Sequence, residues 1–491
     1  MRSEVCVSSG AQQTEASAGI EANYQELVSL SIGNSVLEAN GINGRAVVTG
    51  NYISPMGNLP LPWPDGDWYL RQTLVPAIRE GETVICNTLI PGLLDYYREV
   101  GLIPENTAFI TSDPLVDGEV QYGFPFTDPL ENLPGDYTFD DDSYLCSTFG
   151  GSEVSQQAAR LGLRTLDRAS SDFTNNKAFL RQMAAANNID MLPGALLSSF
   201  DQIDAIVSAD WNTDAGAWLK FPTGSGGDLV YKLNGPFDEE SLLTGVNVLR
   251  DAVKKAFSLG RFAVQVGDYW LDEEIAPGEY PLVVEADAHI FGDVIANAST
   301  QFVARGVGEI SLIGHYLQIT TPEGEYLGNA PFEGMPQQLE GLARAQAQHV
   351  SDYNVRENGY RGIAAIDWFA TRDNYGGNRL SVCELNSRPT ANTPPVIIAA
   401  KLGAAHFLNT NVYTSTMIEG IHDFIDVVGK DLAFGDPRNE GMVVPQSFRT
   451  MVYGDTIVGS PNFKVAVLGR DEDHCQQVIE QLSDKGIRFT P

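Results

Sequence analysis

The spacing of apolar and polar residues predicts an α/β layer near the N-terminus, between residues 44 and 150. Short apolar runs that suit strands alternate there with segments of helical length. The predicted strands cover 45–49, 83–87 and 108–111, and the predicted helices cover 68–78 and 93–100. Strands that alternate with helices in this way favour a parallel sheet.

The pattern predicts further elements in the middle and at the end of the chain. The predicted helices cover 152–163, 178–187, 335–356, 396–402 and 471–483. The predicted strands cover 217–220, 262–266, 281–295, 301–307, 463–468 and 487–489. The strand at 463–468, the helix at 471–483 and the strand at 487–489 would form one β-α-β unit at the C-terminus.

A β-hairpin is predicted between residues 362 and 390, where two strand-like segments flank a polar turn. The segments 363–369 and 380–385 are rich in apolar and β-branched residues, and Asp, Asn and Gly turn formers lie between them. Alternation along the second strand sends Glu384 and Asn386 to one face. Pairing with the first strand can bring Asp367 beside them, so we expect these three side chains to converge.

The converging side chains form a candidate magnesium site. Asp367, Glu384 and Asn386 offer hard oxygen ligands, which Mg²⁺ prefers, and Mg²⁺ usually shares its remaining positions with water and phosphate. Arg388 is expected to continue the same face, where its planar guanidinium suits a phosphoryl oxygen or a carboxylate. The alternative is a solvated hairpin with unrelated polar residues, but the combination favours a site.

A second candidate contact with phosphate lies in the segment AWLKFPTGSGG. The predicted strand carries Lys220 into a Gly-rich loop that includes Ser225, Gly226 and Gly227. Glycines let a backbone approach phosphate closely with its N–H groups directed at it, and Lys220 supplies a point charge. The order differs from a Walker loop, in which the lysine follows the glycines. A loop of this kind is also compatible with a simple hairpin.

Composition limits the class of protein and its partners. The 491 residues are 43% hydrophobic and 9% aromatic, as in a globular protein with sizeable cores. The net charge of −33 would repel nucleic acid and anionic membranes. No apolar run reaches membrane-spanning length, and the start of the chain is predicted to be a flexible tail and not a signal peptide. We therefore expect a soluble cytoplasmic protein.

Cysteine and histidine do not indicate a further site. The five cysteines are scattered without a CxxC pair, which argues against a disulfide framework and against a zinc site. The six histidines lie in no motif of their own and are expected to be structural or surface residues. Lysine is placed selectively, because none precedes Lys177 and the next is Lys220.

An Asp followed by Glu-x-Asn-x-Arg across a hairpin resembles the C-terminal half of an ATP-grasp catalytic domain. The earlier lysines and the Gly-rich loop occur in the order that is typical of that superfamily. The resemblance implies that Lys177 and Lys220 contact nucleotide phosphates. It also implies that Gln265, where the family usually has Glu, contacts adenine, and that Asp272 or Glu273 contacts ribose.

The resemblance implies an α/β fold class, with an ATP-grasp fold that is α+β in its catalytic part and follows an α/β pre-ATP-grasp domain. The strand around Gln301 and the ending NSRPTANTPP make the chain most similar to the pheganomycin-type peptide ligases. The expected units are a tail at 1–25, a pre-ATP-grasp domain at 26–165, a catalytic domain at 166–405 with a nucleotide subdomain at about 175–265, and a C-terminal α/β extension at 406–491.

The implied reaction is an ADP-forming ligation that joins a carboxylate to an amine through an acylphosphate. ATP and Mg²⁺ are the implied cofactors, with Mn²⁺ as an alternative ion, and Lys220 and Arg388 are the implied catalytic residues. The implied partners are small carboxylate and amine substrates, such as an amino acid or a peptide, and a homodimer is compatible with the sequence. Two alternatives stay open: an ATP-grasp enzyme with a non-amine acceptor, and a regulatory protein that binds ATP without turnover.

Overall fold

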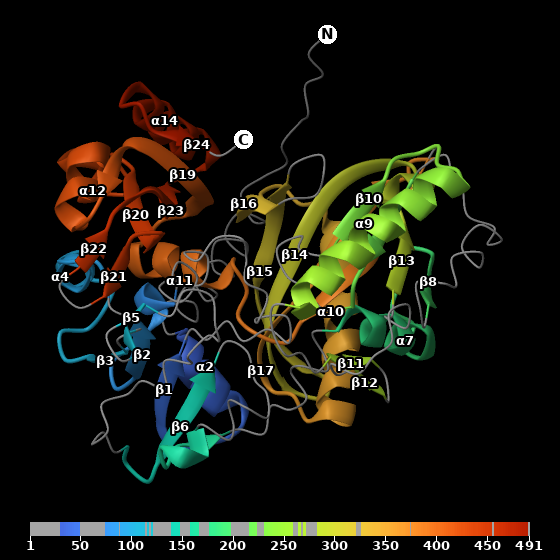
Figure 1. Cartoon of the computed structure of the whole chain (residues 1–491), viewed down its shortest axis with the longest axis horizontal. Coiled ribbons are helices and arrows are strands. Elements are labelled where there is room, and N and C mark those ends of the chain that lie inside the picture. The colour runs from blue at the N-terminus through green and yellow to red at the C-terminus, as the bar shows by residue number, and fades with distance from the viewer. Residues whose placement is uncertain are drawn as a thin grey trace, which may run out of the picture.

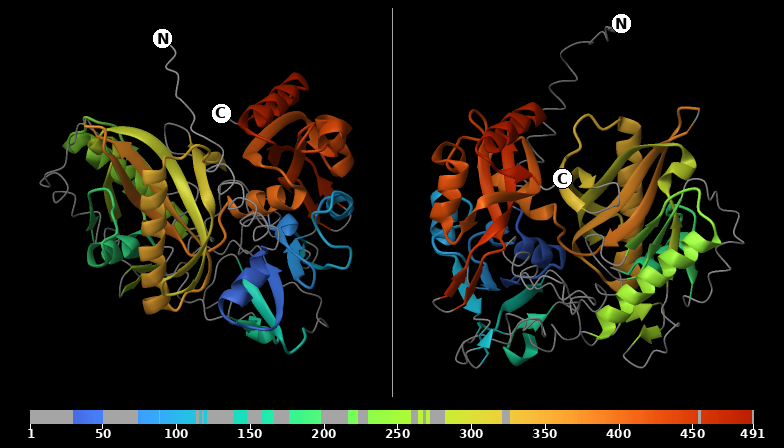
Figure 2. Two further views of the ribbon diagram at one scale, coloured as in Figure 1. Left: turned by 180° about the vertical axis from the view of Figure 1, so that it is seen from behind. Right: turned by 45° about the horizontal axis from the view of Figure 1, so that its top comes forward.

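The computed structural model contains three main sheets in two lobes (Figure 1). One lobe combines the N-terminal and C-terminal parts of the chain, and the other holds the middle, an arrangement that Figure 2 shows from two further sides. The structure describes residues 30–49, 74–87, 89–112, 115–116, 119–120, 139–147, 158–165, 176–197, 216–222, 230–258, 264–266, 269–271, 282–320, 326–373, 375–453 and 456–489.

The N-terminal sheet has five parallel strands in the order β3-β2-β1-β6-β7. Its strands are β1 (Arg45–Thr49), β2 (Thr83–Asn87), β3 (Ala108–Ser112), β6 (Ser143–Ser147) and β7 (Arg164–Thr165). Val47 and Ile85 belong to a small core on one face, while Val48 and Val84 belong to a larger core together with helix α2 (Ile32–Ala39). Strands that are apolar on both faces are typical of parallel sheets, and the predicted parallel layer is confirmed.

A smaller antiparallel sheet has the order β10-β9-β13-β8. Its strands are β8 (Gly194–Leu197), β9 (Ala217–Lys220), β10 (Val230–Leu233) and β13 (Leu282–Ala286). Leu219 and Val284 pack with residues of helix α9 (Glu239–Ser258) in one core. Lys220 and Glu285 are each one position further along their strands, so alternation places them on the face away from α9.

The largest sheet is antiparallel and has the order β18-β17-β14-β15-β16-β19-β23-β20, with β24 also paired to β19. Its strands are β14 (Asp293–Gly306), β15 (Glu309–Thr320), β16 (Tyr326–Pro331), β17 (Gly362–Arg372), β18 (Asn378–Asn386), β19 (His406–Ile418), β20 (Met442–Phe448), β23 (Ser460–Gly469) and β24 (Arg488–Phe489). Since β23 and β24 both run antiparallel to β19, they run parallel to each other. The predicted C-terminal β-α-β unit is confirmed.

The remaining elements connect and cover these sheets. The short strands are β4 (Leu115–Val116), β5 (Glu119–Val120), β11 (Val264–Val266), β12 (Tyr269–Leu271), β21 (Met451–Tyr453) and β22 (Thr456–Val458). The other helices are η1 (Val75–Ala77), α4 (Leu93–Glu99), α7 (Lys177–Asn187), η3 (Ala288–Phe291), α10 (Gln337–Asn358), α11 (Thr393–Leu402), α12 (Ile421–Val428), α13 (Lys430–Ala433) and α14 (Glu472–Asp484). Most of the predicted helices at 68–78 and 152–163 lies outside the described residues.

The predicted strands at 281–295 and 301–307 are wrong in their division. The structure ends β13 at Ala286 and begins a single long strand, β14, at Asp293. The break comes earlier than expected because Asp287 accepts a hydrogen bond from the backbone of His289 and starts a short helical turn. Gly292, with a φ of 124°, then redirects the chain into β14.

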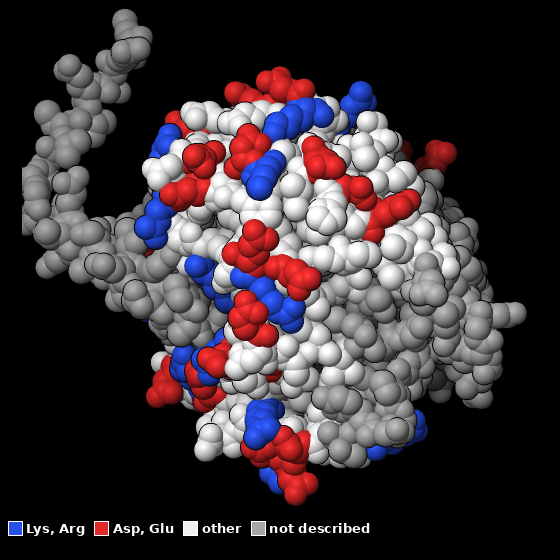
Figure 3. Space-filling view, turned by 90° about the vertical axis from the view of Figure 1, so that its left-hand side faces the viewer, with Lys and Arg blue, Asp and Glu red and all other residues white. Residues whose placement is uncertain are grey.

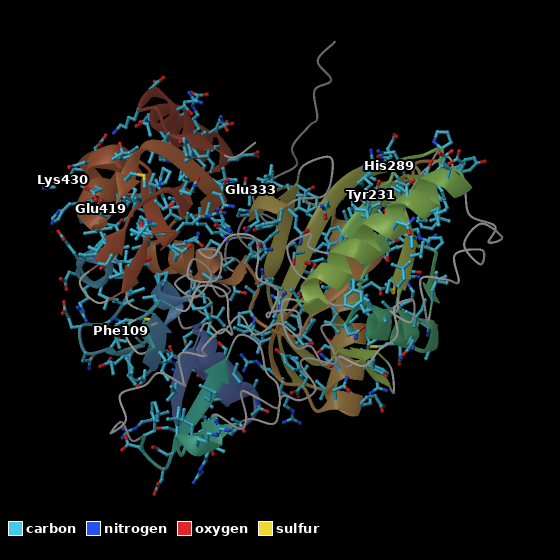
Figure 4. All side chains as sticks on the ribbon, viewed as in Figure 1. Phe109, Tyr231, His289, Glu333, Glu419 and Lys430 are labelled. Carbon is cyan, nitrogen blue, oxygen red and sulfur yellow. The ribbon has the colours of Figure 1, made fainter. Side chains whose placement is uncertain are left out.

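The largest sheet crosses from one lobe to the other through a short pairing of β16 with β19. Gly328 pairs with Thr410 and Asn329 pairs with Asn409. A Cβ atom at position 328 would overlap the backbone carbonyl oxygen of Asn409, so this close approach requires glycine. Glu333, labelled between the lobes in Figure 4, adds an ion pair of 2.5 Å with His406 Nδ1 if that histidine is protonated.

The N-terminal and C-terminal parts share one hydrophobic core. The ring of Tyr96 packs against Phe424, with ring centres 6.2 Å apart. The hydroxyl of Tyr96 donates to the carbonyl of Ala433 at 2.8 Å, and the hydroxyl of Tyr97 donates to that of Pro445 at 2.8 Å. These two buried tyrosines, with satisfied hydroxyl groups, join the N-terminal part of the chain to its C-terminal part.

Charged side chains are mixed on the face shown in Figure 3. Acidic residues lie next to basic ones there, and the described residues on this face form no broad basic patch. Among the described residues, none of the helices is long and apolar enough to cross a membrane.

Candidate functional site

Strands β17 and β18 bring three predicted ligands together. Asp367 lies directly opposite Glu384, and Ala365 lies opposite Asn386. Residues that pair across a ladder share a face, and alternation places Asn386 on the face of Glu384. Asn386 Nδ2 donates a hydrogen bond to Asp367 Oδ2 at 3.1 Å. The structure therefore places all three side chains at one point of the hairpin.

The turn and a bulge set the register of this hairpin. Asp373 Oδ1 accepts hydrogen bonds from the backbone of Tyr375 and of Gly377, both at 2.8 Å. The register shifts between Asp367 and Trp368, because Trp368 pairs with Val382 and leaves Cys383 as the extra residue. Such a bulge changes where side chains point without breaking the strand.

The carboxyl group of Asp367 lies in a crowded acidic environment. Burial and the neighbouring Glu384 raise the pKa of Asp367 to about 6, although the nearby polar side chains of Ser299 and Gln318 and the charge of Arg388 act in the opposite direction. Two carboxylates held this close favour a bound cation, which would stabilise both in the ionised form.

Helix α7 places Lys177 beside the hairpin. Asn176 begins the helix, and its side chain accepts hydrogen bonds from the backbone of Ala178 and Phe179. The Lys177 side chain is buried, and its Nζ lies 3.3 Å from Glu384 Oε1. The backbone N–H of Lys177 also donates to the carbonyl of Pro222 at 2.8 Å, which ties the start of α7 to the chain after β9.

A buried carboxylate, Glu285, joins Lys220 to Arg181. Glu285 Oε1 lies 2.5 Å from Lys220 Nζ, and its Oε2 lies 2.6 Å from Arg181 Nη2. Burial alone would lower the pKa of Lys220, but Glu285, with a smaller contribution from Cys383, raises it above its ordinary value. Glu285 and Arg181 were not predicted from the sequence. The available signal was a single acidic residue in the apolar strand LVVEA.

Cys383 lies between the two groups of charged residues. Burial raises the pKa of its thiol well above the ordinary value, while Lys220 acts to lower it, and Asp367 and Glu285 raise it further. The charges of Lys220 and Asp367 thus both act on Cys383. The backbone N–H of Val382 donates to the carbonyl of Asp190 at 2.7 Å, which joins the segment before β8 to β18.

Arg388 is close to the hairpin but does not continue its strand as expected. Strand β18 ends at Asn386, and the chain bends at Ser387 and Arg388. The guanidinium is buried, Nη1 donates to the carbonyl of Pro389 at 3.2 Å, and its charge lowers the pKa of Asp367. The bend therefore keeps a permanent positive charge beside the acidic pair.

Several predicted contacts lie outside the described residues. Ser225, Gly226, Gly227, Asp272 and Glu273 all lie in segments that the structure does not describe. Gln265 lies in β11 opposite Trp270, with only its backbone described. The predicted contacts with adenine, ribose and the Gly-rich loop therefore stay predictions.

The donor set at the hairpin fits a hard divalent cation. Two carboxylates and one amide supply oxygen atoms, which suit Mg²⁺ or Mn²⁺ better than softer metals. In the described part of the chain, no three His, Cys, Asp or Glu side chains form a metal-binding group. The pair Asp367 and Glu384 would thus need Asn386, together with water or phosphate, to complete a coordination shell.

Comparisons with solved structures reveal similar folds at low sequence identity. The chain is similar to biotin carboxylase from Campylobacter jejuni in its complex with β-γ-ATP, at 10% identity and a TM-score of 0.50, covering 92% of this chain and 93% of that one. It is also similar to N5-carboxyaminoimidazole synthetase from Staphylococcus aureus, at 11% identity and a TM-score of 0.47, covering 90% and 98%. No model of a protein family and no curated protein sequence matches this chain.

The similarity to biotin carboxylase confirms the predicted fold class. The chain has an ATP-grasp fold that is preceded by an α/β unit with a parallel sheet. At 10% identity the likeness concerns the fold alone, and the chemistry must be argued from the site.

Asp367→Asn is expected to change the pH dependence of stability in the metal-free protein. A carboxyl group whose pKa is about 6 in the folded state, against an ordinary 3.8, binds more protons when folded. The free energy of unfolding should therefore fall as the pH rises between these values, by on the order of 2 to 3 kcal/mol from this residue. Urea unfolding with a chelator, at several pH values, compares the two proteins. Identical pH profiles would contradict the raised pKa.

Glu285→Gln should destabilise the protein strongly, because it leaves Lys220 and Arg181 buried without their carboxylate. We expect a loss of about 3 to 5 kcal/mol in the free energy of unfolding, as for other broken buried ion pairs. Glu309→Gln, at an exposed position of β15, is the matched control and should change it by less than about 0.5 kcal/mol. Urea unfolding measures both, and equal stabilities would refute the role of Glu285.

Proposed function

We propose that this chain is an ATP-dependent ligase that joins a carboxylate to an amine through an acylphosphate and releases ADP and phosphate. The observation that carries the proposal is the convergence of Asp367, Glu384 and Asn386 at one point of the hairpin, with Lys177 3.3 Å from Glu384. Two carboxylates, an amide and a buried ammonium group form a combination suited to a magnesium nucleotide.

The nucleotide phosphates would lie between the hairpin and the small sheet. Lys177 and Lys220 approach this space from α7 and from β9, and the charge of Lys220 reaches Cys383 on β18. Asp367, Glu384 and Asn386 would hold Mg²⁺, which supplies charge neutralisation to the phosphates during transfer. Biotin carboxylase, which shares the fold, was solved with β-γ-ATP, and this supports a nucleotide in the shared scaffold.

The transfer itself needs positioning and charge, not a protein nucleophile. The substrate carboxylate would attack the γ-phosphate, and an amine would then attack the acyl carbon and displace phosphate. Arg388, fixed by the bend after β18, would stabilise the negative charge of the transferring group. Cys383 has a raised pKa and is therefore a poor nucleophile at neutral pH.

The narrower features of the proposal rest on the sequence resemblance. We propose a peptide-ligase activity of the pheganomycin type, with an amino acid or peptide as a substrate, a cytoplasmic location and a homodimer. Gln265 on adenine, Asp272 or Glu273 on ribose, and Ser225, Gly226 and Gly227 near phosphate belong to the same proposal.

Glu384→Gln and Asn386→Ala should each lower ATP turnover by about a hundredfold or more while the protein stays folded. The reason is that each removes charge stabilisation that the transition state requires. Glu309→Gln, on the same sheet but exposed at the start of β15, is the control and should retain activity. ADP release with pools of amino acids measures turnover, and circular dichroism checks the fold. Near-normal turnover in both site variants would reject the metal assignment.

Oxygen-18 in the substrate carboxylate should appear in the released phosphate. An acylphosphate retains one carboxylate oxygen on phosphorus when the amine displaces phosphate, so the label moves there. Mass spectrometry of the phosphate and of the nucleotide detects it. Label in AMP would indicate adenylation, ADP release without a new amide would indicate a non-amine acceptor, and ATP binding without ADP release would indicate a regulatory protein.

A further inference from the structure

A row of polar side chains crosses the largest sheet, starting beside Asp367. We call Gln318, Asn329, Asn409, Asn411 and Lys464 the polar row. Gln318 acts to lower the pKa of Asp367 and pairs across the ladder with Asn329, which pairs in turn with Asn409. Asn411 lies two positions after Asn409 and pairs with Lys464. Because directly paired residues and alternate residues share a face, the row keeps to the face of the candidate metal site.

Hydrogen bonds connect the polar row to the segment that follows Arg388. Asn409 Nδ2 donates to Asn329 Oδ1 at 2.6 Å and to the carbonyl of Ala391 at 3.2 Å. Gln446 Nε2 donates to Asn409 Oδ1 at 2.7 Å. The hydroxyl of Tyr326 lies 2.6 Å from Asn329 Oδ1 and 3.3 Å from Asn392 Oδ1. These side chains therefore extend the candidate site away from the phosphate position.

A second set of bonds fixes the same segment to β14. Gln301 Nε2 donates to Thr390 Oγ1 at 3.0 Å, and Thr393 Oγ1 donates to Gln301 Oε1 at 2.9 Å. Gln301 is fully buried and lies two positions after Ser299, which pairs with Asp367 across the ladder. The candidate metal site and the polar row therefore lie on one face of the same sheet.

Lys464 ends the row as a buried cation. It is 4% exposed, and none of the carboxylates in the described part of the chain forms an ion pair with it. Its ammonium group lies 5.9 Å from the centre of the Tyr326 ring. Burial lowers the pKa of Lys464 to about 8. Burying a charged ammonium group costs free energy unless an anion balances its charge.

Lys401 shows how this chain otherwise satisfies a buried lysine. Its ammonium group donates to the backbone carbonyls of Pro76, Ile78 and Leu102. Lys464 makes no such bonds to described residues. Nearby hydrogen-bonding capacity is also unused, because Gln446 Oε1, Asn329 Nδ2 and Ser447 Oγ are buried without a partner among the described residues.

We propose that Lys464 binds a carboxylate of the amino-acid or peptide substrate. This carboxylate is a different one from the carboxylate that is phosphorylated. The amide groups of the polar row would bind the substrate backbone, and its reacting end would lie beside Asp367 and Arg388. This assignment rests on the proposed ligase function. It adds the substrate class that the function leaves open: a molecule with amide or amine groups and a free carboxylate at the end remote from the reaction.

The chemistry of the row favours a carboxylate over a phosphate. One ammonium group balances one negative charge, and the side chains that line the row are uncharged amides and hydroxyl groups. A phosphate would bring more negative charge than the single ammonium group of Lys464 balances. Since the row is enclosed, salt should screen the ion pair only weakly.

A direct test measures the lysine amine by carbon NMR in protein with ¹³C-labelled lysine. The signal of Lys464 is assigned by its loss in Lys464→Met, with the exposed Lys430→Met, labelled in Figure 4, as the control. In chloride we expect a pKa near 8. Sodium acetate at equal ionic strength should raise it, because a bound carboxylate favours the charged amine. A pKa that acetate does not change would overturn the proposal.

Kinetics provide the second test. Lys464→Met should raise the KM for a carboxylate-bearing amine substrate by about tenfold or more, as expected for a lost charge-assisted hydrogen bond. Its affinity for MgATP should stay within about twofold, and Lys464→Arg should restore part of the KM. When the carboxylate of this substrate is amidated, the wild type and Lys464→Met should have the same KM for it. An unchanged KM would reject the role of Lys464. MgATP binding by the wild type without amide formation would instead reject the ligase function. In either case the NMR titration decides whether Lys464 binds an anion.

Discussion

The register between β17 and β18 is the constraint on which the candidate site depends. Side chains alternate along a strand, so a shift by one residue would send Glu384 and Asn386 to the opposite face and away from Asp367. The turn at Asp373 fixes one end of the hairpin, and pairing with β14 fixes the edge of β17 that faces away from β18. The extra residue at Cys383 gives the local change in direction while Asp367 stays opposite Glu384.

Positive charge is concentrated locally in a chain whose net charge is −33. Lys177 lies beside Glu384, Lys220 and Arg181 share Glu285, and the charge of Arg388 reaches Asp367. The cations are therefore held by carboxylates before any ligand arrives. This arrangement stabilises the folded protein, and in the proposed function it would keep the lysine and arginine side chains ordered for the nucleotide phosphates. An acidic protein can in this way bind an anion without a basic surface.

Much of this architecture could be predicted from the sequence, because it depends on local patterns. Alternation and turn formers indicated the hairpin, and the spacing of Glu384 and Asn386 indicated a shared face. Glu285 could not be assigned a role, since its partners lie on α7 and β9 and only folding brings them together. The bulge at Cys383 and the bend at Arg388 depend on the partner strand, which spacing alone does not reveal. The buried position of Lys464 depends on pairing with two other strands of the sheet.

Gly328 limits how far a chain with this architecture can diverge. It lies at the narrow join between β16 and β19, where a side chain would overlap the carbonyl oxygen of Asn409. Any replacement would push the C-terminal strands away from the rest of the sheet, although the residue belongs to no candidate site. Mutational drift should therefore be slow at this position even when most of the surface has changed. In distant relatives that are recognisable by shape more than by sequence, a glycine at this join is a marker by which two chains can be aligned.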